Sequence, residues 1–265
     1  MIATRKTMDA GNTPLAWAAG SGHEEVVEIL LGRDGVNPDK PNNNGETPLW
    51  HAARNGHEGV VKMLLGRDDV DPDKPNNYGR TPLWYAALNG HERVVKVLLR
   101  KDGVNPNEAA LYGLTPLCGA AKNGHEGVVE MLLERDDVNP DKPNKNGRTP
   151  LWYAALNGHE GVVKVLLSQD EVNPNEAGQY GLTPFCGAAK NGHEGVAEIL
   201  LGRSDVNPNI PDNYHRTPLC WAAWNGHEGI VKMLLRRDDI NPDEPTLQAL
   251  TALWRAAQDG NEGVV

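Results

Sequence analysis

Seven Gly-His-Glu triplets carry the side chains of this 265-residue chain that most resemble a metal site. Their histidines follow one another at constant 34-residue intervals: His23, His57, His91, His125, His159, His193 and His227. Imidazole is a common metal ligand, but zinc ligands must converge on one ion at about 2.0–2.3 Å. Side chains that stand one sequence period apart cannot converge in this way. We therefore predict no metal site and expect these histidines to form hydrogen bonds in a turn between two helices.

The three cysteines, Cys118, Cys186 and Cys220, occupy one position of the same period. If neighbouring periods pack at about 8–10 Å, equivalent Cα atoms are too far apart for a disulfide, which needs about 4.4–6.8 Å. Tryptophans stand at this position in other periods, for example Trp50 and Trp84. We therefore expect reduced thiols that pack between neighbouring helices.

The loop from Asp69 to Asp73 has carboxylates at alternate positions, as calcium loops do. A calcium loop also needs a glycine at its sixth position and a glutamate at its twelfth, where this chain has Lys74 and Arg80. The sequence contains no nucleophile motif, phosphate-binding loop or dinucleotide fingerprint. We predict neither a cofactor nor an enzymatic activity.

The elements that position these residues follow from a Thr-Pro dipeptide that recurs with the same 34-residue period. Strict periods of this length indicate an array of structural repeats, which bury their cores between neighbours and leave long open surfaces. We divide the chain into one domain, 1–265, of eight repeats: roughly 9–42, 43–76, 77–110, 111–144, 145–178, 179–212, 213–246 and the truncated 247–265.

One period predicts two short helices and a loop. Thr47 is a typical N-cap and Pro48 suits the first helical turn, so the first helix begins there and ends at Asn55-Gly56. The second runs from His57-Glu58 to about Arg67, with its valines and leucines on one face. The stretch 68–79, rich in Pro, Asn and Asp, predicts a loop or hairpin finger.

The motif Thr-Pro-Leu-x-x-Ala-Ala-x-x-Gly-His-x-x-Val-Val-x-x-Leu-Leu resembles the ankyrin repeat over essentially the whole chain. The resemblance implies an all-α repeat solenoid of L-shaped helix pairs with β-hairpin or loop fingers, and a protein-interaction module. Two features depart from the family. Its usual fourth-position histidine is replaced, mostly by Trp or Cys, and the segment after the second helix, Arg67 to Pro72, has no glycine for a left-handed cap. The near-identical repeats most resemble ankyrin arrays of fungal multidomain proteins, including receptor-like NTPases whose arrays sense ligands.

Composition narrows the partner class. The formal net charge of −10 and the pI near 5.4 argue against nucleic-acid binding, which usually shows a basic domain. No apolar run approaches the roughly 18 residues of a membrane span. We expect an intracellular, cytoplasmic or nuclear, monomeric module with a protein or peptide partner and no membrane contact. The incomplete last repeat and the absence of a polar first repeat suggest part of a longer protein.

Three positions vary between repeats while their neighbours hardly change, so we expect them to be exposed and to bind the partner. They are the fingertip column before Thr-Pro, the fifth motif column and the variable column before Asn-Gly-His. With the finger tyrosines, the predicted partner-binding residues are Arg54, Tyr78, Arg80, Tyr85, Leu88, Tyr112, Leu114, Gly119, Lys122, Arg148, Tyr153, Leu156, Tyr180, Leu182, Gly187, Lys190, Tyr214, Arg216, Trp221 and Trp224.

These columns also have a 68-residue period, which spans two repeats. Aromatic ridges at Tyr85, Tyr153 and Trp221 alternate with glycines at Gly119 and Gly187, which predicts ridges about 20 Å apart with open troughs between them. Duplication of a two-repeat unit explains the period without a function, whereas a partner with periodic anchors explains it through binding. Because the columns hold many cations and only one acid, Glu46, we expect an acidic or mixed acidic-apolar segment in the concave groove. The alternative is a structural spacer without a dedicated ligand.

Overall fold

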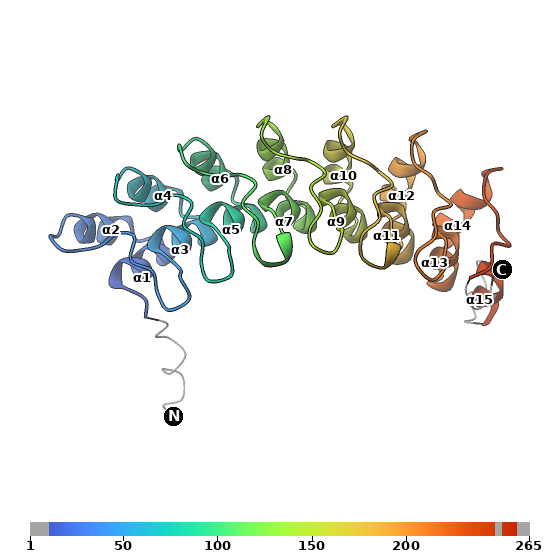
Figure 1. Cartoon of the computed structure of the whole chain (residues 1–265), viewed down its shortest axis with the longest axis horizontal. Helices are drawn as coiled ribbons and strands as arrows, with labels where there is room; N and C mark the ends of the chain where they lie inside the picture. Colours follow the sequence, from blue (N-terminus) through green and yellow to red (C-terminus); the bar gives the residue numbers. More distant parts are fainter. Residues whose placement is uncertain (1–10, 247–250, 259–265) are drawn as a thin grey trace, which may run out of the picture. The chain divides into compact units, whose positions relative to one another are not determined.

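The computed structural model describes residues 11–246 and 251–258, which form short helices in successive pairs (Figure 1). In the described part of the chain seven pairs are followed by one further helix, α15. The helices are α1 (Pro14–Ser21), α2 (Glu24–Leu31), α3 (Pro48–Asn55), α4 (Glu58–Leu65), α5 (Pro82–Leu88), α6 (Glu92–Leu99), α7 (Pro116–Asn123), α8 (Glu126–Leu133), α9 (Pro150–Asn157), α10 (Glu160–Leu167), α11 (Pro184–Asn191), α12 (Glu194–Leu201), α13 (Pro218–Trp224), α14 (Glu228–Leu235) and α15 (Ala252–Gln258).

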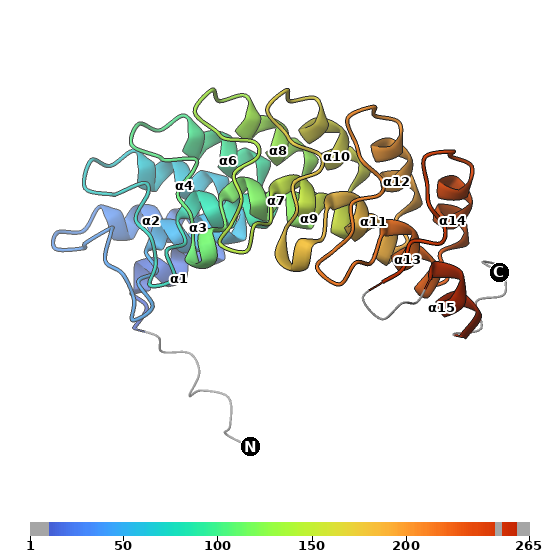
Figure 2. The same cartoon turned by 45° about the vertical axis from the view of Figure 1, so that its right-hand side comes forward.

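The contacts divide the chain into two compact units. Unit 1 comprises 1–120 and 127–138, and unit 2 comprises 121–126 and 139–265. In unit 1 the first helices α1, α3 and α5 pack in order, as do the second helices α2, α4 and α6 (Figure 2). In unit 2 the same holds for α9, α11, α13 and α15, and for α10, α12 and α14. Each of these helices is therefore stabilised by neighbouring helices of its unit, as its length of about two turns requires.

The first helix of each pair begins and ends as predicted. The Thr47 hydroxyl accepts a hydrogen bond from the Trp50 amide at 3.1 Å, and Pro48 occupies the first turn. At the other end Gly56 is left-handed, with φ 79°, and its amide returns to carbonyls of the last turn. The glycine is required for a second reason: an added Cβ would lie 2.7 Å from the imidazole of His91 in the next repeat.

The second helices α2, α4, α6, α10, α12 and α14 end without a left-handed cap, as expected after α4 from the segment Arg67 to Pro72, which has no glycine. Gly66 after α4 has φ −71°. A cation from the following repeat binds the terminal carbonyl instead: the guanidinium of Arg135 donates to the Leu99 carbonyl at 3.1 Å, and Lys101 donates to that of Leu65 at 3.0 Å. Arg67, Arg203 and Arg237 make the equivalent bond. The ends of α2, α4, α6, α10 and α12 are thus completed by the following repeat.

The predicted role of the histidines within a turn is wrong. His57 Nε2 lies 3.0 Å from the carbonyl of Gly20 in the preceding repeat, and the Asn55 amide donates to the same oxygen at 2.6 Å. His91, His159, His193 and His227 make the equivalent contact at 2.9–3.1 Å. The carbonyls they reach are in the last turn of a first helix, where intrahelical donors have run out. The histidines therefore join repeats rather than the two helices of one repeat.

Small and aliphatic side chains form the core between helices. Ala52 and Ala53 are fully buried, as are their equivalents in the other complete repeats after the first. The three cysteines are buried and reduced, in agreement with the sequence prediction, and burial raises the pKa of the Cys186 thiol to about 11. The position shared by tryptophan and cysteine is a packing position.

The fingers are loops closed by turns, and the described residues contain no β-strand. In the second repeat the Gly45 amide donates to the Asn42 carbonyl and the Asn42 amide to the Glu46 carbonyl, both at 3.0 Å. Adjacent fingers are joined by main-chain bonds, such as that from Leu111 to the Tyr78 carbonyl at 3.0 Å. Among the residues that the structure describes, left-handed backbone falls on three that are not glycine: Tyr112, Tyr180 and His215.

Candidate protein-binding surface

The first helices and the fingertips of each unit form what we call the inner surface. Short helices that start at Thr-Pro fix its variable side chains at set positions of each repeat. Of the predicted binding residues, six are exposed: Arg54, Tyr78, Tyr112, Lys122, Tyr180 and Tyr214. Nine are half-buried: Arg80, Tyr85, Leu88, Leu114, Arg148, Leu156, Lys190, Arg216 and Trp224. Leu250, in the same fingertip column, and the side chain of Arg255 lie outside the described residues.

The prediction of exposure is wrong for five of the residues: Gly119, Tyr153, Leu182, Gly187 and Trp221 are buried. The Tyr153 side chain is 5% exposed, and its hydroxyl accepts a hydrogen bond from the Asn144 side chain at 3.0 Å. Trp221 is 8% exposed because Arg216 and Lys190 cover its ring at 4.2 and 4.4 Å from the centroid. Variation between repeats therefore does not by itself identify an exposed column.

The predicted troughs at the glycines are filled. A Cβ added to Gly119 would lie 3.5 Å from Leu88 Cδ1, and one added to Gly187 would lie 3.3 Å from Leu156 Cδ1. The leucine of the preceding repeat occupies the space that the aromatic side chain takes in the alternate repeats. The 68-residue period is thus a packing alternation between a large side chain and a glycine covered by leucine.

In unit 1 two arginines lie on aromatic rings. The Arg80 guanidinium lies 4.9 Å from the centroid of Trp84 and donates a hydrogen bond of 2.6 Å to the Tyr85 hydroxyl. Arg54 lies 5.3 Å from the centroid of Trp50 and 5.6 Å from that of Tyr85. Cation–π contacts of this kind hold a guanidinium flat against a ring and leave the edge of its fork free for an acceptor.

In unit 2 the same arrangement recurs with different partners. The Arg148 guanidinium lies 4.7 Å from the centroid of Trp152 and donates to the Gln179 side chain. Arg216 differs, because it forms an ion pair at 2.6 Å with Asp212, whose side chain is fully buried. Arg216 is therefore part of the folded structure as well as of the inner surface.

The cations of the inner surface are less paired than those of the loops after the second helices. Within the described ranges, no carboxylate lies within 4.0 Å of the charged groups of Arg54, Arg80, Lys122, Arg148 or Lys190. In contrast, Arg67, Arg135, Arg203 and Arg237 each pair with the aspartate two residues on, at 2.7–2.8 Å. The inner surface therefore keeps positive charge that the rest of the molecule does not neutralise.

Sequence reasoning missed the tryptophans of the fourth motif position, which support this surface. The Trp84 indole donates to the Leu114 carbonyl at 2.9 Å and the Trp152 indole to the Leu182 carbonyl at 2.8 Å. They join each first helix to the next finger and carry the stacked arginines. The signal was present in the sequence, since Arg80 and Arg148 each stand four residues before the tryptophan on which they lie.

Among the residues described, no group of three or more His, Cys, Asp or Glu side chains could hold a metal ion. In the same part of the chain no helix has the length and apolar character needed to cross a bilayer.

Comparison with known proteins gives one family. A family model described as ankyrin repeats (3 copies) matches the chain three times, at residues 15–110, 103–177 and 171–246. No curated protein sequence matches the chain significantly.

Proposed function

Because the chain belongs to the ankyrin repeat family, whose members are generally protein-interaction modules, we propose that its inner surface binds an acidic, partly apolar segment of a partner protein. The module acts as a monomer inside the cell, without enzymatic activity of its own and without nucleic-acid or membrane partners. The binding residues are the exposed and half-buried members of the predicted set, with the cations of the inner surface at their centre.

The observation that carries this proposal is the unpaired, aromatic-backed positive charge. A guanidinium that is stacked on a ring has lost part of its rotamer freedom before a ligand arrives, so less entropy is lost on binding. Its free donors suit a carboxylate, and long-range attraction between opposite charges raises the association rate. Apolar contact beside the cations is offered by four half-buried side chains: Tyr85, Leu88, Leu156 and Trp224.

The structural spacer remains the second candidate, and one observation favours it. Tyr153 and Trp221, which a spacer would not need in exposed positions, are buried and serve packing. The two candidates differ in whether the inner surface selects a sequence. Selection of peptides from a displayed random library separates them: we expect enrichment of segments with Asp or Glu next to Leu or aromatic residues. Failure to enrich any sequence would support the spacer.

The site is tested with two variants of equal charge change. The inner variant combines Arg54→Glu, Lys122→Glu and Lys190→Glu, and the outer variant combines Lys62→Glu, Lys164→Glu and Lys232→Glu on the second helices. Arg216 is left intact because its removal would leave the buried Asp212 carboxylate without a partner. We expect the inner variant to bind the selected peptides at least about tenfold more weakly, through slower association, and the outer variant to resemble wild type. Equal weakening in both variants would refute the assignment.

A further inference from the structure

The first helix pair has an open apolar face that every following pair has covered. Val26 of α2 is 45% exposed, whereas its equivalents Val60, Val94, Val128, Val162, Val196 and Ile230 are at most 1% exposed. Pro14 at the start of α1 is exposed, and the corresponding prolines of the six later pairs are buried. Since the first pair has its following neighbour in place, the side left open is the one that faces a preceding repeat.

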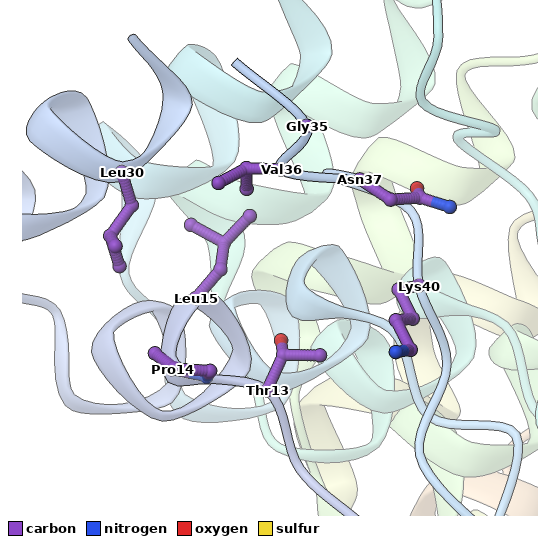
Figure 3. Close-up of a pocket in the computed structure, with 8 residues that line it drawn as sticks. All are labelled: Thr13, Pro14, Leu15, Leu30, Gly35, Val36, Asn37 and Lys40. Carbon is purple, nitrogen blue, oxygen red and sulfur yellow. The ribbon is translucent and has the colours of Figure 1, made fainter. Parts of the chain in front are cut away.

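A pocket of about 210 Å³ lies on this first pair, lined by Pro14, Leu15, Leu30 and Val36 (Figure 3). In the next repeat the leucine equivalent to Leu30, Leu64, is fully buried. The valine equivalent to Val36, Val70, is 5% exposed. The pocket is therefore the open half of a contact that the chain makes elsewhere between its own repeats.

The same face holds two donors whose equivalents bind a preceding repeat. His57 and Arg67 reach the carbonyls of Gly20 and Leu31. The side chains of their counterparts in the first repeat, His23 and Arg33, make no hydrogen bond to any described residue, although their main-chain groups do. Apolar area, an imidazole and a guanidinium are thus arranged as in the other repeats, but without the backbone acceptors that they would meet.

One position of the face differs in charge from all later repeats. At the second residue of the second helix the later repeats have glycine, except for Arg93, and the first repeat has Glu25. The glycine accommodates a carboxylate of the preceding repeat: a Cβ on Gly59 would overlap Glu24, and one on Gly161 would overlap Glu126. The exception, Arg93, instead faces Glu58 of the preceding repeat. The pKa of the Glu58 carboxyl is lowered mainly by its hydrogen bond with Lys62 and more weakly by the charge of Arg93. If a repeat of the same kind preceded the first one, the glutamate that begins its second helix would be repelled by the like charge of Glu25.

We propose that this face is a docking surface for an ankyrin repeat that has a lysine or arginine where this chain's repeats begin their second helix with glutamate. The docked helix pair covers Val26, Leu30 and Val36. Its last-turn carbonyls accept from His23 and Arg33, and its basic residue pairs with Glu25. Two observations define the occupant: the contact between successive repeats that the chain itself makes along its length, and Glu25, which calls for a basic residue where the chain's own repeats have glutamate.

Fit is tested by covalent attachment, which raises the effective concentration of a weakly docking repeat to about millimolar. Residues 1–8 of the full chain are replaced by a copy of residues 43–76, which continues the 34-residue register. One fusion keeps glutamate at the copied position 58 and the other carries Glu58→Lys there. We expect amides of α2 to exchange about tenfold more slowly in the lysine fusion than in the unfused chain. We also expect its melting temperature to exceed that of the glutamate fusion by about 2–4 °C.

Val26→Glu provides the matched control. In the unfused chain this change should leave folding intact because Val26 is exposed, and in the lysine fusion it should abolish the protection of α2. Unchanged exchange in the lysine fusion would overturn the docking surface. A glutamate fusion at least as stable as the lysine fusion would overturn the basic partner. If the unmodified chain sediments as a dimer that Val26→Glu dissociates, the occupant is a second copy and the proposal is wrong.

Discussion

At the scale of single residues, an aspartate or asparagine in each loop joins neighbouring repeats. Asn175 accepts from the Asn207 amide at 2.8 Å and donates to the Asp205 carbonyl at 2.6 Å. Asp73, one of its equivalents, accepts from the Asn105 amide at 3.0 Å, but its second carboxylate oxygen is buried without a partner. In Asn175 the corresponding atom is the side-chain nitrogen, which donates to the Asp205 carbonyl of the next repeat. In Asp73 an oxygen, which cannot donate when ionised, takes the place of that nitrogen.

Burial is the main cause that raises the pKa of Asp73 to about 6, opposed by the Asn105 amide and assisted by Glu108 and Asp71. Because the folded pKa is above the ordinary value of 3.8, the contribution of Asp73 to stability is greatest below pH 4 and is lost as the pH rises through about 6. Asp73→Asn should restore the missing donor and raise the free energy of unfolding at pH 7.5 by about 1 kcal/mol. Urea unfolding at several pH values measures this, and the gain should shrink towards pH 4.

Asn107→Asp is the reciprocal control, because Asn107 donates to the Asp137 carbonyl at 2.5 Å. It should destabilise the chain at pH 7.5 and do so less at pH 4. A gain from Asp73→Asn that does not change with pH would show that the buried oxygen is not the cause.

At the scale of elements, the glycine of α7 tests how first helices pack. The place of an added Cβ on Gly119 is in ordinary contact with Leu88. Gly119→Ala should therefore stabilise the helix by about 0.5–1 kcal/mol through the lower entropy of the unfolded chain. Gly119→Leu must displace Leu88 and should destabilise by about 1–3 kcal/mol.

Denaturant unfolding of both variants gives the comparison. Gly187→Ala, where Leu156 is closer, should gain less than Gly119→Ala. If the leucine variant is as stable as wild type, the space over Gly119 is open and the trough predicted from the sequence exists after all.

Helix limits could be predicted because local chemistry decides them: a Thr47 hydroxyl for the first turn and a left-handed Gly56 for the end. The burial of Tyr153 could not, since it depends on Asn144 in the finger and on packing between repeats. The same is true of His57, whose acceptor lies in the preceding repeat. The predicted exposure agrees with the structure where charge and local stacking decide it, as for Arg54, and is wrong where a neighbouring repeat covers the position.

At the scale of the whole molecule, stability depends on having a neighbour on each side. Helix α15 contacts α13, yet Trp254 is 49% exposed whereas the equivalent Trp152 is 4% exposed. Amides of α15 should therefore exchange faster than those of α9, because less surface is buried against them. Hydrogen exchange measured residue by residue decides this. Equal protection of the two helices would contradict it.

The bonds between repeats have one further consequence. The bonds of the histidines and arginines reach back into the preceding repeat, and those of the asparagines reach either the preceding or the following repeat, so each joins adjacent repeats only. Deletion or duplication of one whole repeat by recombination between near-identical copies would leave each junction with a donor and an acceptor of the usual kind. Deletion or duplication of two repeats at once would also keep the alternation of an aromatic residue and a glycine at the fifth motif position. The array can therefore lengthen or shorten by in-register exchange without passing through an unfoldable intermediate.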